Sequence, residues 1–215
     1  MAHWEQAIRK FTDPLVREMA LRGQYRSFPK GELIIREGDA GDAVYVILSG
    51  KVKVYVSDAQ GREMIVADYA AGDYVGEMAL DGKARSASVA AVEITVCSVV
   101  ARDALRRAIH DDPEIAMRMI ATLIDRNRNA TGCLKNLALM DVYGRVARLL
   151  LDLETTVEAD GRAWSRERLT QQEIASRVGA SRDMISRILK DLRTGGYIAL
   201  REKRVAILRR PPARW

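Results

Sequence analysis

The feature that most constrains the fold is a series of glycines at nearly regular intervals through residues 24–100. They occur at positions 31, 38, 41, 50, 61, 72 and 76. Between them lie AVYVIL, KVKVYV and MIVADY, which are rich in β-branched and aromatic residues and partly alternate. SASVAAVEITVCSVV continues the series to about Val100, and no helix of crossover length interrupts it. The pattern therefore predicts an antiparallel β jelly-roll, as a sandwich or barrel, rather than an α/β fold.

Helical spacing appears on both sides of this region. DPLVREMALR predicts a short helix with Asp13 as N-cap and Pro14 at its first position. ARDALRRAIHD predicts a second helix, and Pro113 begins a longer one, PEIAMRMIATLIDRNRNATGCLKNLALM. In the long helix, residues at steps of three and four form an a/d heptad seam: Ile120, Leu123, Asn127, Ala130, Leu134 and Leu137. We favour a homodimer through this 113–140 helix; the alternative is a helix packed against its own domain.

The whole positive excess of the chain lies in its last third. Residues 141–215 hold 16 Lys/Arg and 10 Asp/Glu, a balance of +6, whereas residues 1–140 hold 19 of each. This distribution indicates one domain that meets a polyanion, with a solvated basic surface as the alternative. No apolar run approaches the length of a membrane span, and MAHWEQAIRK has no apolar h-region. We therefore expect a cytoplasmic protein without a membrane partner.

The cysteines and histidines do not suggest a metal site. Cys97 and Cys133 are far apart and form no CxxC pair, and the only histidines are His3 and His110. We therefore expect no bound metal. We also expect both thiols to be packing residues in a reducing compartment and not to form a disulfide.

Two short helices joined by a glycine turn follow a first helical segment, VYGRVARLLLDLE. LTQQEIASRVG begins with Thr170 and Glu173 at the spacing of a capping box, and Gly179 ends it. Ser181 can cap the next helix, SRDMISRILKDLRTGG, and YIALRE with RVAILRR predicts a hairpin after it. Together these segments predict a winged helix-turn-helix that binds double-stranded DNA. A solvated three-helix bundle is the alternative.

The second of these helices has the chemistry of a DNA-reading helix. Its apolar stripe consists of Ile185, Ile188, Leu189 and Leu192, and its opposite face is polar. We predict that Arg182, Asp183 and Arg187 read bases, because arginine can hold guanine and a carboxylate can accept from cytosine. Ser186 lies on the same polar face. Residues better placed for phosphates are Thr170, Gln171, Gln172, Ser181 and Lys190.

A last motif, GEMALDGKARSAS, places Glu77 eight residues before Arg85 among small residues. Alone, such a pair in a loop is more often a surface ion pair than a binding site. The motif and its context, however, resemble the CRP/FNR family of bacterial transcription regulators over nearly the whole chain. GEMALDGKARSAS is similar to the phosphate-binding cassette of cyclic-nucleotide-binding domains. NLALMDVYGRVARLLLDL resembles that family's hinge, and TQQEIASRVGASRDMISRILKDLRTGGYI its helix-turn-helix.

The resemblance implies a domain order and a ligand site. The domains would be a cyclic-nucleotide-binding barrel over 1–110, a dimerisation helix and hinge over 111–140, and a winged helix-turn-helix over 141–215. Arg85 would pair with the cyclic phosphate and Glu77 would accept from the ribose hydroxyl. The implied site further comprises Gly76, Met78, Ala79, Ser86 and Ala87. Ala130 and Thr131 stand where cyclic-AMP receptors have a Thr-Ser pair that reaches the adenine.

The function implied is transcription regulation by a homodimer on a palindromic DNA site, with RNA polymerase as a further partner. Cyclic AMP is the first expectation for the effector, and cyclic GMP, cyclic di-GMP or activity without nucleotide are the alternatives. Asp183 stands where the resemblance expects glutamate, so the half-site would be similar to the family's without being identical. We expect no enzyme, because no nucleophile–base pair or poised histidine accompanies Glu77 and Arg85.

Overall fold

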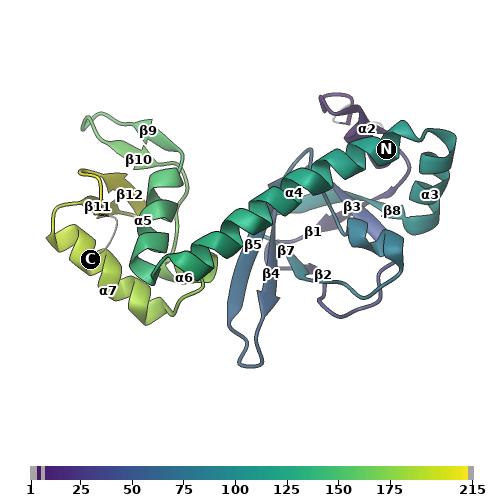
Figure 1. Ribbon diagram of the computed structural model, residues 1–215. Coiled ribbons are helices and arrows are strands. Elements are labelled where there is room, and N and C mark those ends of the chain that lie inside the picture. Colours follow the sequence, from purple (N-terminus) through teal and green to yellow (C-terminus); the bar gives the residue numbers. More distant parts are fainter. Residues whose placement is uncertain (1–3, 6–7, 213–215) are drawn as a thin grey trace. The chain divides into compact units, whose positions relative to one another are not determined.

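The computed structural model describes residues 4–5 and 8–212, which form two compact units (Figure 1). The first unit comprises the residues up to Val56 together with Val66–Asn129, and the second comprises Ser57–Ile65 together with the residues from Ala130 onward. Helix α4 (Glu114–Leu139) contributes to both units. The three domains predicted with boundaries at 110 and 140 therefore remain a prediction. No helix of the described residues is long and apolar enough to cross a membrane.

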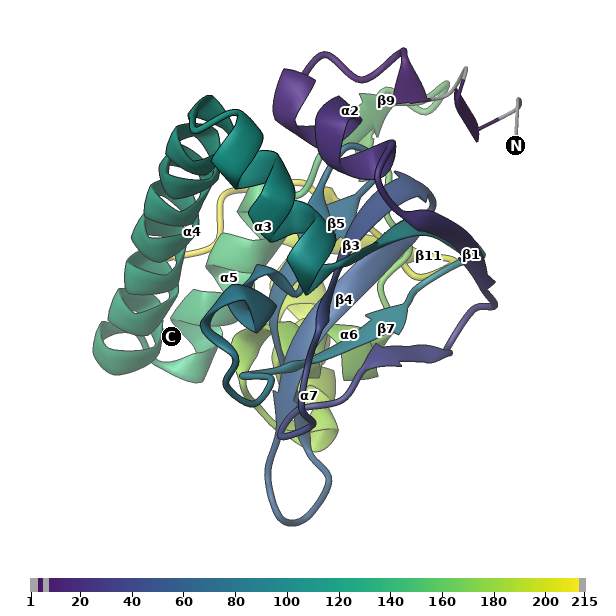
Figure 2. The same ribbon diagram turned by 90° about the vertical axis from the view of Figure 1, so that its right-hand side faces the viewer.

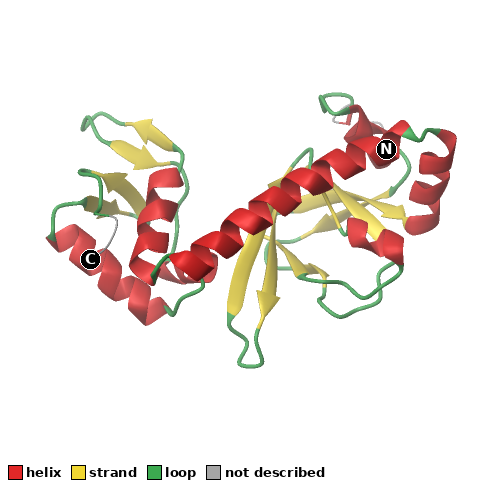
Figure 3. Ribbon diagram, in the orientation of Figure 1, coloured by secondary structure: helices red, strands yellow, loops and turns green. Residues whose placement is uncertain are grey.

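Two four-stranded antiparallel sheets build the first unit (Figure 3). One sheet has the strand order β1 (Gln24–Phe28), β8 (Thr95–Ala101), β3 (Ala43–Ser49), β6 (Tyr74–Val75). The other has the order β2 (Leu33–Ile35), β7 (Ser88–Ala91), β4 (Lys51–Ser57), β5 (Glu63–Ala70). The predicted antiparallel jelly-roll type is confirmed.

Strand β3 shows why the sequence of this region alternates only in part. Its sheet is buried on both faces, which favours a continuous apolar run over alternation. Val44 and Val46 pack in a cluster with side chains of α2 (Pro14–Ala20) and α3 (Arg102–Asp111). Ile47 points the other way and packs with Val52 and Val89 of the second sheet. Figure 2 shows α2 and α3 beside the strands of this unit.

The second unit joins three helices to a small sheet (Figure 3). The helices are α5 (Val142–Asp152), α6 (Gln171–Val178) and α7 (Arg182–Thr194). The sheet has the order β11 (Ile198–Arg201), β12 (Arg204–Ile207), β10 (Ala163–Ser165), β9 (Thr155–Val157). The helix-turn-helix with its following hairpin, β11–β12, is as predicted. The β9–β10 hairpin was not predicted, because strands of three residues are too short to show alternation.

The predicted helix caps are present. The Asp13 carboxylate accepts a hydrogen bond from the Leu15 amide at 2.8 Å. Thr170 and Glu173 form a reciprocal capping box at the start of α6. The Ser181 hydroxyl accepts from the Met184 amide at 3.3 Å at the start of α7.

The two thiols differ in their surroundings. Cys97 lies in the core between the two sheets, and burial raises the pKa of its thiol to about 12. Cys133 is exposed on α4. The prediction of a packing role is therefore wrong for Cys133 in the single chain, because its position faces away from the rest of the chain's core.

An ionic cluster ties the two hairpins of the second unit together. The Glu158 carboxylate accepts from Arg201 and Arg204, and the Asp160 carboxylate accepts from the Trp164 indole N–H at 3.0 Å. The Arg201 guanidinium also lies 4.3 Å from the centre of the Trp164 ring. Hydrogen bonds from Arg204 and Arg201 lower the pKa of Glu158, and the one from Trp164 lowers the pKa of Asp160.

The lowered pKa of Glu158 makes the cluster sensitive to acid. The pKa of Glu158 is lower in the folded chain than in the unfolded chain. Ionised Glu158 therefore stabilises the folded chain at pH values above its unfolded-state pKa, and this contribution is lost as the pH falls through its folded-state pKa. We expect Glu158→Gln to lower the melting temperature of the full chain near neutral pH, and this difference to shrink as the pH falls below the ordinary pKa of a glutamate. Thermal circular dichroism measures both.

A matched control for this substitution is Glu154→Gln. Glu154 pairs with Arg166 at 3.4 Å, and its side chain is 81% exposed. We expect a smaller loss in melting temperature from this exposed pair. Equal melting temperatures for Glu158→Gln and the unchanged chain near neutral pH would contradict the role of the cluster.

Candidate functional site

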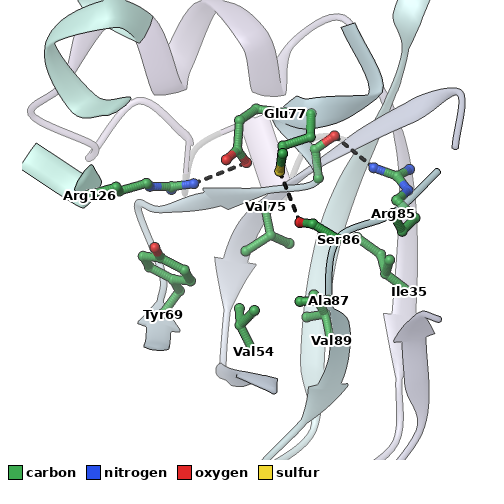
Figure 4. Close-up of a pocket in the computed structure, with 12 residues that line it drawn as sticks. Ile35, Val54, Tyr69, Val75, Glu77, Arg85, Ser86, Ala87, Val89 and Arg126 are labelled. Atoms are coloured by element: carbon green, nitrogen blue, oxygen red, sulfur yellow. Dashed lines mark hydrogen bonds and ion pairs between the residues drawn. The ribbon is translucent and has the colours of Figure 1, made fainter. Parts of the chain in front are cut away.

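A pocket in the first unit gathers most of the predicted cassette (Figure 4). Its empty volume, part of which is open to solvent, is about 480 Å³, within the usual range of small-molecule sites. Six predicted residues line it: Gly76, Glu77, Met78, Arg85, Ser86 and Ala87. The lining is completed by residues that were not predicted: Ile35, Val54, Tyr69, Val75, Val89 and Arg126.

Arg85 is a buried cation in the wall of this pocket. The residue is only 7% exposed, yet no carboxylate of the described residues forms an ion pair with it. Its guanidinium donates to the backbone carbonyls of Gly76 and Ala43, each at 2.7 Å. A buried charge without a counter-ion is costly. The two carbonyl oxygens offset only part of that cost. Binding of an anion next to the Arg85 guanidinium would offset more of it, so the site favours an anionic ligand.

Two glycines make room for the Arg85 side chain. A Cβ atom at Gly41 would overlap the guanidinium, and one at Gly76, where φ is +81°, would lie 2.7 Å from it. The backbone of Arg85 is held as well, because its amide donates to Asp39 at 2.9 Å and its carbonyl accepts from Gly38 at 2.9 Å. The loop before β3 therefore fixes both ends of the residue.

Ser86 and Ala87 bring hydrogen-bond donors to the same end of the pocket. None of the turn and loop hydrogen bonds among the described residues uses the amide N–H of Ser86 or Ala87. The Ser86 hydroxyl donates to the Met78 sulfur at 2.9 Å (Figure 4). A thioether sulfur is a weak acceptor. Next to the Arg85 guanidinium, these groups form a site that suits an oxyanion.

Arg126 connects α4 to the start of the cassette. Its guanidinium pairs with the Glu77 carboxylate at 3.0 Å and donates to the Tyr74 carbonyl at 2.6 Å. It also lies 4.4 Å from the Tyr69 ring centre and 4.8 Å from that of Tyr74. The two charged side chains are 18% and 13% exposed. One carboxylate is therefore set against two arginines, Arg85 and Arg126, which leaves the pocket with one net positive charge.

The remaining wall of the pocket is apolar and aromatic. Ile35, Val54, Val75 and Val89 line it together with the Tyr69 ring. Burial raises the pKa of the Tyr69 hydroxyl, so the phenol remains a neutral donor. The site thus combines an anion-binding end with an apolar surface that suits a flat ring.

Three predicted ligand residues do not line the pocket. Ala79 lies in the short 3₁₀ helix Glu77–Asp81, and its side chain is 1% exposed, so burial removes it from the pocket. Ala130 and Thr131 are exposed on α4 and belong to the second unit. Contact of Ala130 and Thr131 with the base of a nucleotide, which also involves a second subunit, stays a prediction.

Sequence reasoning missed Arg126, although a signal was present. Ile115, Met119 and Thr122 precede it at helical spacing and lie on the less exposed face of α4. An arginine on such a face requires a partner, and Glu77 supplies it. The apolar lining residues carry no comparable signal, because in sequence they cannot be told from core positions of the strands.

The second candidate site is the outer face of α7. The residues predicted to read bases, Arg182, Asp183 and Arg187, are exposed on this face. Ser186 and Lys190, the latter predicted to contact a phosphate, are exposed there too. The stripe Ile185, Ile188, Leu189 and Leu192 is buried, as predicted. The structure therefore brings the five polar residues together on one face.

The cations of this face have no carboxylate partner among the described residues. Seven arginines of the second unit form ion pairs: Arg62, Arg148, Arg166, Arg168, Arg177, Arg201 and Arg204. In the described part of the chain, Arg182, Arg187 and Lys190 form none. The unneutralised positive charge on α7 is therefore available to an external anion.

Of the residues predicted to contact phosphates, Thr170 is already engaged. Its hydroxyl donates to the Glu173 carboxylate at 2.7 Å and accepts from the Glu173 amide at 3.1 Å. Gln171, Gln172 and Ser181 lie at the starts of α6 and α7 and are at least partly exposed. The phosphate roles of these four residues and of Lys190 remain predictions.

Two parts of the chain match known family models. Residues 25–112 match the model of the cyclic nucleotide-binding domain, and residues 144–212 match that of the Crp-like helix-turn-helix domain. The chain belongs to the CRP/FNR family. Its similarity to individual members of this family extends over most of its length.

Two curated relatives are cyclic-AMP-activated regulators by name. The CRP-like cAMP-activated global transcriptional regulator of Mycobacterium tuberculosis is 37% identical over 184 residues, covering 84% of this chain and 82% of that protein. The cAMP-activated global transcriptional regulator CRP of Escherichia coli is 32% identical, covering 91% and 95%. A similar solved structure is that of the c-di-GMP-responsive global regulator CLP of Xanthomonas campestris. Its TM-score is 0.81 at 25% identity, covering 90% of this chain and 97% of that one.

The link between α4 and the cassette in this CRP/FNR family member can be measured by a double-mutant cycle. We expect Arg126→Leu and Glu77→Gln to be coupled by about 0.5–3 kcal/mol in the free energy of unfolding, because the pair is mostly buried. Urea unfolding of the single and double variants measures the coupling.

The control pair, Asp125 and Arg128, flanks Arg126 on the same helix. Arg128 and Asp125 are 2.9 Å apart on α4, but their side chains are 74% and 71% exposed. Their coupling should be within about 0.5 kcal/mol. Additive effects of Arg126→Leu and Glu77→Gln would show that the ion pair contributes nothing beyond the separate side chains.

Proposed function

We propose that this protein is a homodimeric, sequence-specific DNA-binding transcription regulator controlled by a cyclic nucleotide, with cyclic AMP as the effector. The observation that carries the nucleotide part is Arg85, a buried cation without a carboxylate partner that lines a pocket. A single negative charge, such as a cyclic phosphate, would balance it. The cyclic nucleotide-binding domain matched by residues 25–112 supports the same conclusion.

The parts of a cyclic nucleotide fit the two ends of the pocket. Its phosphate would accept hydrogen bonds from Arg85, the Ser86 hydroxyl and the free amides of Ser86 and Ala87. Its ribose hydroxyl would donate to Glu77, whose carboxylate has room for a second partner beside Arg126. The base would lie against the apolar wall that includes Val54 and Val89.

Cyclic AMP is the first candidate because the curated relatives from Mycobacterium tuberculosis and Escherichia coli are named for it. The similar structure of the c-di-GMP-responsive regulator supports cyclic di-GMP as an alternative. Cyclic GMP, and a regulator that is active without nucleotide, are further alternatives. Where cyclic-AMP receptors have a Thr-Ser pair, this chain has Ala130 and Thr131, so only Thr131 would offer a hydroxyl to the base.

The exposed seam of α4 supports a homodimer through residues 113–140. Ile120 is 46% exposed, Leu123 40% and Leu134 65%, while Ile115 and Met119, nearer the start of the helix, are buried. A second copy would cover this apolar seam in a coiled coil. In such a dimer Thr131 of either subunit would approach a nucleotide.

The proposed coupling runs through α4. This helix is continuous from Glu114 to Leu139, and Arg126 joins it to Glu77 of the cassette. A nucleotide that binds better to the DNA-competent state shifts the dimer toward it. The two copies of α7 would then meet half-sites about 34–36 Å apart on a palindromic operator.

The domain organisation and cellular role follow from this proposal. The nucleotide-binding domain would comprise residues 1–110, the dimer helix and hinge 111–140, and the winged helix-turn-helix 141–215. A regulator of this kind would act in the cytoplasm, contact RNA polymerase and carry out no enzymatic reaction. The named relatives, which are transcription regulators, support the last point.

Calorimetry tests the nucleotide part. We expect the purified chain to bind cyclic AMP more tightly than cyclic GMP or cyclic di-GMP. Arg85→Ala should weaken that binding at least about tenfold, since it removes a hydrogen-bonded charge pair. The control Arg62→Ala removes an arginine that is 78% exposed and pairs with Asp58, and it should leave the affinity unchanged. Absence of binding by the unchanged chain would exclude nucleotide control.

Selection from random double-stranded DNA, followed by anisotropy titrations at fixed salt, tests the DNA part. We expect Arg187→Ala to weaken binding by about 1–3 kcal/mol and to relax the preference at one base pair. The control Arg166→Ala removes an arginine that is already paired with Glu154, and it should change binding by less than about 0.5 kcal/mol. Equal losses for both variants would show that α7 binds only non-specifically.

A further inference from the structure

Met78 lines the pocket, and its thioether contacts one of the groups proposed to bind the ligand. Its sulfur accepts the hydrogen bond of the Ser86 hydroxyl at 2.9 Å (Figure 4). Ser86 is also one of the groups that would hold the anionic end of a ligand. Met78 therefore controls the direction in which this hydroxyl donates.

The same side chain is open to solvent. Met78 is 49% exposed, whereas Met19 and Met119 are 0% and 3% exposed. Exposure and access decide which thioethers an oxidant reaches, and oxidation turns an apolar side chain into a polar one. Met117, at 59%, and Met184, at 44%, are comparably exposed but do not line the pocket.

We propose that Met78 is a modification site, at which oxidation by a peroxide to methionine sulfoxide lowers the affinity of the pocket for its anionic ligand. This inference rests on the proposed function of the same pocket. In the reaction a lone pair of the Met78 sulfur attacks one oxygen of hydrogen peroxide. The O–O bond breaks as the S–O bond forms, and proton transfer to the leaving oxygen releases water. Sulfur loses two electrons, and the peroxide is reduced by two.

The product would act on the ligand in two ways. The sulfoxide oxygen is a much stronger acceptor than a thioether, so it would hold the Ser86 hydroxyl and withdraw it from the ligand. It would also place a partial negative charge beside the site where Arg85 meets an anion. Both effects disfavour an anionic ligand, and a methionine sulfoxide reductase would reverse them.

The test compares the full-length chain with Met78→Leu and the matched control Met117→Leu. Each protein is treated with hydrogen peroxide, quenched with catalase and titrated by calorimetry with the cyclic nucleotide that the untreated chain binds. Peptide mass spectrometry measures the sulfoxide fraction at each methionine. Treatment should weaken binding at least about tenfold in the unchanged chain and in Met117→Leu. Whatever the starting affinity of Met78→Leu, treatment should not alter it.

Two further readouts bear on the same site. The loss of affinity should follow the sulfoxide fraction at Met78 rather than at Met117 or Met184, and methionine sulfoxide reductase should restore it. Bound nucleotide should slow oxidation of Met78 but not of Met117. Full affinity with Met78 completely oxidised, or an equal loss in Met78→Leu, would overturn this inference alone. Absence of binding by the untreated chain would overturn the proposed function and this inference with it.

Discussion

The first unit depends on the placement of one buried cation, Arg85. Its side chain fits only because Gly41 and Gly76 leave space where a Cβ atom would collide with it. Backbone carbonyls hold the guanidinium but do not neutralise it. The strands and the loop before β3 thus keep a charge in a low-dielectric setting, where an arriving anion gains more than it would in water. A binding site for an anion follows from this arrangement.

Arg126 extends this constraint from the sheet to the long helix. Its guanidinium takes part in an ion pair, a carbonyl contact and two ring contacts at once. Because Glu77 belongs to the cassette and Arg126 to α4, this ion pair joins the pocket to the helix. The same helix carries the exposed apolar seam. The ligand pocket and the proposed dimer surface therefore share one element.

The second unit uses charge differently. Several of its arginines are neutralised by neighbouring carboxylates, as in the cluster of Arg201 and Arg204 around Glu158. The cations on the outer face of α7 are not neutralised. Net charge alone would have placed the basic excess anywhere in the last third of the chain. Pairing within the fold leaves Arg182, Arg187 and Lys190 unneutralised on a helix whose opposite face is buried.

The sequence by itself determined the jelly-roll type, the order of the helices, the caps at Asp13, Thr170 and Ser181, and the cassette motif, because each depends on local periodicity or short-range spacing. Only the tertiary structure decided which groups meet across long separations. It paired Arg126 with Glu77 and withdrew Ala79 from the pocket. It also formed the β9–β10 hairpin from strands too short to recognise. Such contacts arise from packing between distant segments, and no local pattern records them.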